Sequence, residues 1–258
     1  KLKLNKVSKD TYLKVFDQHI TKSTLRPDNF DKLNSSLIIS LDHTDFNLTS
    51  GIDVYEDLQT KKNSDRYQYN LPYYNFDKLI SENFFNGNIN FSSSGSNYLK
   101  DTNKLETKIT NDFIYNSLDF ISNLGIKNNY SLSLKNLNSV GKHSSKYKSN
   151  PQVEIAGLFN VDLSMPLEKK DENYDNLLTP KLSFRFNPSD MKDNSLSNNR
   201  INVGNAFALN RLGLSDTLEA GKSITLGLDY INEKKDNLDQ INNYFELKLA
   251  TVFRDKEE

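Results

Sequence analysis

Long stretches in which apolar and polar residues alternate are the feature that most constrains how this chain can fold. In residues 182–187 every second residue is apolar, in the order Leu, Ser, Phe, Arg, Phe, Asn. The same period of two runs through residues 105–115, 153–163, 201–209, 224–230 and 245–253. Because side chains two positions apart lie on the same side of a β-strand, each stretch is predicted to form a strand with one apolar and one polar face.

Further strands are expected where the alternation is weaker, at residues 11–17, 35–42, 46–55, 66–73, 87–99 and 119–134. With the stronger stretches they make about 12 strands. The strands are joined by polar connections such as residues 142–150 and 187–199. No helical pattern of about 12 residues or more competes with them. The chain is therefore predicted to be all-β and antiparallel, and no boundary divides residues 1–258 into separate domains.

Two architectures use strands of this kind. In a soluble β-sandwich, two apolar faces pack on one another, and the strands are usually about 5–6 residues long. In an outer-membrane β-barrel, strands of about 9–11 residues turn an apolar face to lipid and a polar face to an aqueous lumen. The long strands and their charge-rich second faces favour the transmembrane barrel, and the sandwich remains the alternative.

The composition indicates a folded chain whose apolar residues are thinly spread. Apolar residues make up 36% of the chain and the mean hydropathy is -0.69, whereas average globular chains are about 45–50% apolar. The 13 tyrosines and 15 phenylalanines argue against disorder. A formal net charge of -1 gives no field that would attract nucleic acid. The absence of cysteine excludes disulfides and thiolate metal sites.

The two ends of the chain lead to a further expectation. Residues 1–16 hold no apolar run of the length found in signal sequences. At the other end, the last predicted strand is followed directly by the charged residues 254–258. We therefore expect residues 1–258 to be an internal segment of a larger barrel, an open and curved sheet that lacks the first and last strands of the parent.

A run of specific residues precedes the strand predicted at 224–230. Between 205 and 221 it contains Asn205, Phe207, Asn210, Arg211, Gly213, Asp216, Glu219 and Gly221. Its two glycines permit a positive φ or a close backbone approach, and Arg211 is placed to form a bidentate ion pair with Asp216 or Glu219. A wide barrel needs inward structure because its own side chains cannot fill the lumen. The run therefore predicts a locked loop that folds inward, not a catalytic site.

This run resembles the motif of the lipopolysaccharide-assembly protein LptD family, formerly called organic solvent tolerance proteins. The family carries an Asn-x-Phe, then Asn-Arg, Gly, Asp, often Glu and Gly, and then an alternating strand. Residues 177–190, with Pro180, resemble the strand and loop that precede this motif in the family. Residues 11–17 and 69–78 resemble landmarks of its earlier strands. The resemblance implies the middle of the large C-terminal barrel of such a protein, without its N-terminal periplasmic domain.

The resemblance also implies a function. LptD-type proteins insert lipopolysaccharide into the outer leaflet of the outer membrane. The implied partners are an LptE-type lipoprotein plug, the periplasmic bridge proteins that deliver lipopolysaccharide, lipopolysaccharide itself and outer-membrane lipid, with no nucleic acid and no cofactor. Two alternatives stand beside it. One is another outer-membrane barrel, such as a porin or an adhesin translocator, and the other is a soluble β-sandwich binding module.

Few residues outside the motif suggest chemistry. The polar face of the strand near residue 105 is expected to meet a solvated lumen through Lys104, Glu106, Lys108 and Asp112. The three histidines lie far apart in polar surroundings, at His19, His43 and His143, and a zinc site would need closer spacing. A Ser-His-Asp hydrolase would need a histidine beside a serine, and the only adjacent pair, His143 and Ser144, lies in a lysine-rich stretch. We therefore expect neither catalysis nor a metal site.

Overall fold

The computed structural model describes residues 1–20, 29–60, 64–101, 103–171, 174–189, 199–235 and 241–255. Strands contain 64% of the described residues and helices contain 4%, so the all-β prediction is confirmed. The short helices are α1 (Tyr12–Val15), η1 (Asp17–His19) and η2 (Ser64–Arg66). Among the described residues, none of the helices is long and apolar enough to cross a membrane.

The strands of the described residues form one antiparallel sheet of 13 strands, which does not close on itself. Along the sheet the order is β1 (Leu2–Lys3), β2 (Lys32–Asp42), β3 (Phe46–Asp57), β4 (Tyr67–Ser81), β5 (Gly87–Lys100), β6 (Lys104–Ser117), β8 (Lys127–Lys142), β9 (Gln152–Ser164), β11 (Tyr174–Asn187), β12 (Gly221–Lys235) and β13 (Ile241–Arg254). Two short strands lie off this path: β7 (Phe120–Ile121) pairs with β8, and β10 (Leu167–Lys170) pairs with β11. Each long strand pairs with the next long strand along the chain, which is the topology of an up-and-down barrel wall.

The chain divides into two compact units, which are described separately. Unit 1 consists of Lys1–Leu79, Phe91–Asp112 and Asn136–Glu154. Unit 2 consists of Ile80–Asn90, Phe113–Lys135 and Ile155–Glu258. Strands β4, β5, β6, β8 and β9 supply residues to both units. The predicted motif therefore belongs to unit 2, whereas the four charged residues predicted near residue 105 belong to unit 1.

In unit 1 an apolar cluster joins α1 to the strands that follow it. Leu13 packs there with Leu33 of β2 and Leu58, which comes just after β3. The strand predicted at 11–17 is wrong, because this segment is helical. The amides of Lys14 and Val15 both donate to the carbonyl of Thr11. Leu13 is the one buried residue of α1, so a single helical turn is enough to bring its apolar side chain to the sheet.

Two other predicted strands also differ from the structure. Residues 119–134 do not form one strand, since the chain turns between β7 and β8. At this turn Ser122 Oγ accepts the amide of Ile126 at 3.2 Å, and Gly125 has a φ of 77°. The strand predicted at 201–209 is wrong as well, because these residues form consecutive turns in the connection between β11 and β12.

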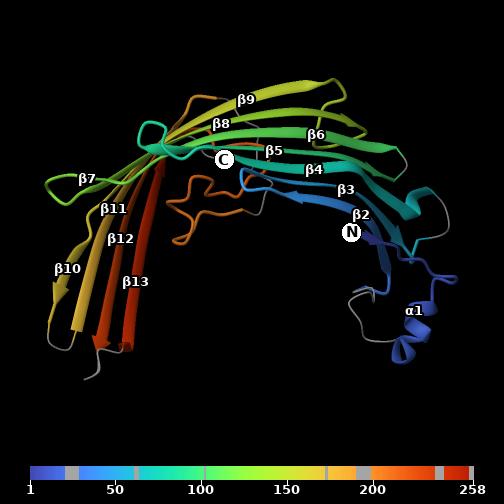
Figure 1. Ribbon diagram of the computed structural model, residues 1–258, viewed down its shortest axis with the longest axis horizontal. Helices are drawn as coiled ribbons and strands as arrows, with labels where there is room; N and C mark the ends of the chain where they lie inside the picture. The colour runs from blue at the N-terminus through green and yellow to red at the C-terminus, as the bar shows by residue number, and fades with distance from the viewer. Residues whose placement is uncertain are drawn as a thin grey trace. The chain divides into compact units, whose positions relative to one another are not determined.

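The strands of unit 2 bury their polar faces and expose their apolar faces. On β11, Ser183 and Arg185 are 1% and 4% exposed, whereas Leu182 and Phe184 are 36% and 40% exposed. On β12, which pairs with β11 and β13 (Figure 1), the buried residues are the polar Ser223 and Thr225. A soluble sandwich would bury the apolar faces instead. This reversed burial contradicts the sandwich alternative and matches the wall of a transmembrane barrel.

Candidate functional site: a connection folded onto the polar face

The connection between β11 and β12 lies against the buried polar face of unit 2. The two strands pair as far as Asn187 and Gly221, so the intervening residues leave the sheet and return to the same place. Figure 1 draws this connection in orange, and the structure describes its residues 188–189 and 199–220. Connections longer than about 12–15 residues without helices or strands are uncommon and usually functional. The predicted motif occupies this connection and the first residue of β12.

Two asparagines close the first turn among the described residues 199–220 of the connection. Asn202 Oδ1 accepts the amide of Gly204 at 2.8 Å, and Asn205 Oδ1 accepts the amide of Asn202 at 2.7 Å. Asn205 Nδ2 donates to the carbonyl of Arg200 at 2.9 Å. Asparagine side chains often replace backbone partners in this way in turns. These local bonds compete with strand pairing, which explains why the alternating residues 201–209 do not join the sheet.

Asn210 and Gly213 build the second turn. Asn210 Oδ1 accepts the amide of Leu214 at 3.0 Å, and Asn210 Nδ2 donates to the carbonyl of the same leucine at 2.8 Å. Gly213 has a φ of 63°, and Gly221 at the start of β12 has a φ of 82°. Of the two possibilities predicted for these glycines, a positive φ or a close backbone approach, the positive φ is present at both. The amide of Gly213 donates to the carbonyl of Asn210 at 3.0 Å, so the turn is bonded through both side chain and backbone.

Arg211, inside this second turn, joins the connection to β12. It is 2% exposed and forms a bidentate ion pair with Glu219. Its guanidinium also donates to Ser223 Oγ at 3.0 Å and to Thr225 Oγ1 at 3.3 Å. The predicted ion pair is confirmed with Glu219, and Asp216, the other acid considered, is also buried. A charge buried at this depth requires a partner, so the pair holds the connection in one position.

Glu219 is bonded from two further strands. Asn187 Nδ2, at the end of β11, donates to the carbonyl of Glu219 at 3.0 Å. Arg254 Nη1, at the end of β13, lies 3.5 Å from Glu219 Oε1. One buried residue of the connection thereby contacts β11 and β13, and through Arg211 it is linked to β12.

Two cations on the strands hold the backbone of the connection. Arg185 of β11 donates to the carbonyls of Ala208 and Leu209, both at 2.7 Å. Lys135 of β8 donates to the carbonyl of Ser215 at 3.2 Å. Sequence reasoning missed both residues. The only signal in the sequence that could have identified them is that each cation alternates with the apolar face of its strand, at a position whose neighbours on the same face are mostly small and polar.

Apolar contacts complete the interface between the connection and the sheet. Leu218 is buried with Ala156 and Leu158 of β9, and Leu209 packs against this cluster. Ala156 and Leu158 interrupt the otherwise polar buried face of β9, and the connection covers them in place of water.

Phe207 occupies a space that a glycine leaves open. A Cβ atom added at Gly227 of β12 would lie 2.5 Å from Cζ of the Phe207 ring. Lys181 Nζ lies 5.7 Å from the centroid of the same ring, in a cation–π contact. The motif phenylalanine therefore fits onto β12 only because residue 227 has no side chain.

We expect Gly227→Ala to displace Phe207 and to lower the free energy of unfolding by about 1–3 kcal/mol, the usual cost of overpacking. Unfolding of the purified protein by urea in detergent micelles measures the effect. Gly157→Ala is the matched control, because the nearest atom to a Cβ at that strand glycine is 3.4 Å away, an ordinary contact. Equal unfolding midpoints for the two variants would contradict the packing described for Phe207.

The second predicted set of residues lies on β6 in unit 1. Lys104 forms an ion pair with Asp101 at 3.2 Å, and Glu106 Oε1 accepts a hydrogen bond from Ser144 Oγ at 2.6 Å. Lys108 and Asp112 are half-buried on the same face. These side chains lie on the face of β6 opposite the exposed Ile109, so they share the polar face of the strand.

The β8–β9 connection folds back over this polar face. From the sequence, this connection was predicted only to be a polar linker. Its Ser144 hydroxyl bonds Glu106 and also accepts the amides of Lys146 and Tyr147 at 3.0 and 3.1 Å. Tyr147 is 6% exposed. Within the described part of the chain, no three histidine, aspartate or glutamate side chains gather as the ligands of a metal ion would.

An antiparallel sheet with exposed apolar faces and covered polar faces defines the class of the protein as a partial transmembrane β-barrel. The family model of LptD, LPS transport system D, matches residues 1–257, and the chain therefore belongs to this family. The resemblance seen in the sequence motif is thereby confirmed. LptD-family proteins act in lipopolysaccharide transport and are outer-membrane proteins. No curated protein matches the chain.

Proposed function

We propose that this chain is part of an outer-membrane translocon that inserts lipopolysaccharide into the outer leaflet of the outer membrane. The observation that carries the proposal is the family match over residues 1–257. The reversed burial of β11 and β12 supports a position in the membrane, because exposed apolar faces are stable against lipid. The family match favours lipopolysaccharide as the cargo over the solutes of a porin.

In this proposal the polar face of the sheet is the lumen side of the barrel. The connection that carries Arg211 and Glu219 is then the inward loop, and it occupies part of the lumen in unit 2. Its buried ion pair and its bonds to Arg185 and Lys135 support a fixed plug-like loop. In unit 1 the lumen face includes Lys104, Glu106, Lys108 and Asp112.

The proposed partners follow from the same family. An LptE-type lipoprotein would plug the lumen, and periplasmic bridge proteins would deliver lipopolysaccharide to it. The charge of the chain is close to zero, so these partners would dock through local groups and not through a long-range field.

Depletion of the protein in its host tests the proposal. We expect newly made lipopolysaccharide to stop reaching the cell surface while porins still assemble, because a general defect in barrel assembly would affect both. Surface delivery is followed by pulse labelling and by a modifying enzyme that acts only on surface lipopolysaccharide. Normal delivery after depletion would refute the proposed function.

A further inference from the structure

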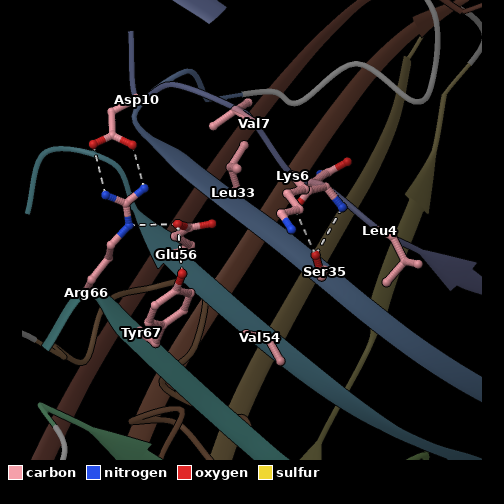
Figure 2. Close-up of a pocket in the computed structure, with 11 residues that line it drawn as sticks. Leu4, Lys6, Val7, Asp10, Leu33, Ser35, Val54, Glu56, Arg66 and Tyr67 are labelled. Atoms are coloured by element: carbon pink, nitrogen blue, oxygen red, sulfur yellow. Dashed lines mark hydrogen bonds and ion pairs between the residues drawn. The ribbon is translucent and has the colours of Figure 1, made fainter. Parts of the chain in front are cut away.

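Unit 1 contains a pocket that the proposed function does not use. The pocket has a volume of about 670 Å³ and lies between the N-terminal segment and strands β2, β3 and β4 (Figure 2). Its apolar lining consists of Leu4, Val7, Leu33 and Val54. Pockets of about 300–1,000 Å³ are the size that holds small ligands.

Its polar end is built around a buried arginine. Arg66 is 2% exposed, and its guanidinium donates to both oxygens of Asp10 at 2.8 and 3.0 Å and to Glu56 Oε1 at 2.7 Å. The hydrogen bonds to Asp10 raise the pKa of Arg66, so the guanidinium stays charged. Tyr67 donates its hydroxyl to the same Glu56 oxygen at 3.1 Å.

These contacts leave one carboxylate oxygen available. In the part of the chain that the structure describes, both hydrogen bonds to the Glu56 side chain end on Oε1. Figure 2 shows the second oxygen pointing away from Arg66 and into the pocket. The pocket therefore presents a fixed negative acceptor to any cationic group that enters it.

A positive group lines the same pocket on the N-terminal segment. Lys6 is exposed and forms no ion pair with the described residues. Its neighbour Asn5 is fixed to β2, because its amide donates to Ser35 Oγ at 3.0 Å. One open carboxylate oxygen and one ammonium group in a single pocket are complementary to a zwitterion that carries an ammonium and a phosphate.

The pocket continues onto an apolar surface. Ser35 and Val54 face one another across β2 and β3, and the next pair on the same face is Leu37 with Ile52. Leu37 and Ile52 are 42% and 38% exposed. In a transmembrane barrel such a surface meets acyl chains, so a molecule in the pocket can be polar at one end and apolar at the other.

We propose that this pocket binds the headgroup of a phosphoethanolamine lipid. The ammonium of the headgroup donates to Glu56, the phosphate accepts from Lys6, and the acyl chains lie along Leu37 and Ile52. The inference rests on the fold and the pocket, and it does not depend on lipopolysaccharide export.

Native mass spectrometry of the detergent-purified chain tests the inference with dioctanoyl phosphatidylethanolamine as the probe. We expect bound lipid on the wild type and about tenfold weaker binding in Lys6→Ala, because a charge-assisted hydrogen bond is lost. Lys9→Ala is the matched control, since Lys9 is an exposed lysine of the same segment that does not line the pocket. Val54→Phe fills the pocket with an apolar group and should abolish binding.

Three results would overturn the inference. Unchanged binding in both Lys6→Ala and Val54→Phe would place the lipid elsewhere. Equal binding of dioctanoyl phosphatidylglycerol would show that the ammonium is not recognised. Displacement by free phosphoethanolamine at the same concentration as the lipid would show that the acyl chains make no contact, so that the ligand is a soluble group. Each variant is first checked for an unchanged unfolding midpoint in urea.

Discussion

Arg211→Ala is expected to release the β11–β12 connection from the polar face and to lower the free energy of unfolding by about 3–5 kcal/mol, the cost of breaking a buried ion pair. The substitution leaves Glu219 buried without its bidentate partner and removes the donors to Ser223 and Thr225. The remaining cation, Arg254, makes a single long contact of 3.5 Å. Urea unfolding in micelles gives the energy, and protease cleavage within the connection under native conditions reports its release.

Two further variants make this result specific. Arg200→Ala removes an exposed arginine of the same connection, whose described contact is through its backbone carbonyl, and it should leave both measurements unchanged. Arg211→Lys keeps the charge but not the bidentate geometry, so it should fall between the wild type and Arg211→Ala. Protease resistance that is the same in Arg211→Ala and Arg200→Ala would show that the ion pair does not hold the connection.

Leu226→Arg is expected to destabilise the protein in a lipid bilayer by about 2–4 kcal/mol, the measured range for arginine at the middle of a barrel strand. Leu226 is 45% exposed near the middle of the β11–β12 pairing. On the surface of a soluble protein the same exposed leucine would tolerate the change within about 0.5 kcal/mol. Folding into phospholipid vesicles, titrated with urea, distinguishes the two cases.

The matched control for this substitution is Leu124→Arg. Leu124 is 76% exposed in the turn between β7 and β8, and charges near the membrane interface cost about 0–1 kcal/mol. We expect only the strand variant to fold poorly in vesicles. If both leucines tolerate arginine equally well, the exposed face of β12 does not contact hydrocarbon.

Much of the fold could be predicted from the sequence because strand faces leave a period of two. The alternation at 182–187 and 224–230 corresponds to β11 and β12, and the polarity of their faces was also predicted. The prediction failed where local bonds override the alternation. At 201–209 the side chains of Asn202 and Asn205 close turns. The apolar and polar residues alternate in that stretch although it does not pair with another strand.

The candidate site could be predicted only in its local part. Arg211 and Glu219 lie close in the sequence, so their pairing was accessible to reasoning about charge and spacing. The contacts of Arg185 and Lys135 with the connection end on backbone carbonyls. Every residue has a backbone carbonyl, so the identity of the partner residue gives no information from which such contacts could be predicted.

The docked connection also orders the events of folding. The hydrogen bond from Lys135 to Ser215 spans 80 residues of chain, and the contact from Arg254 to Glu219 spans 35. Contacts between residues distant in the sequence form late, because closing a long loop has an entropic cost that only prior structure offsets. We therefore expect the connection to settle after β8 and β13 are in place. Its closure would then mark the time at which these two strands have already assembled.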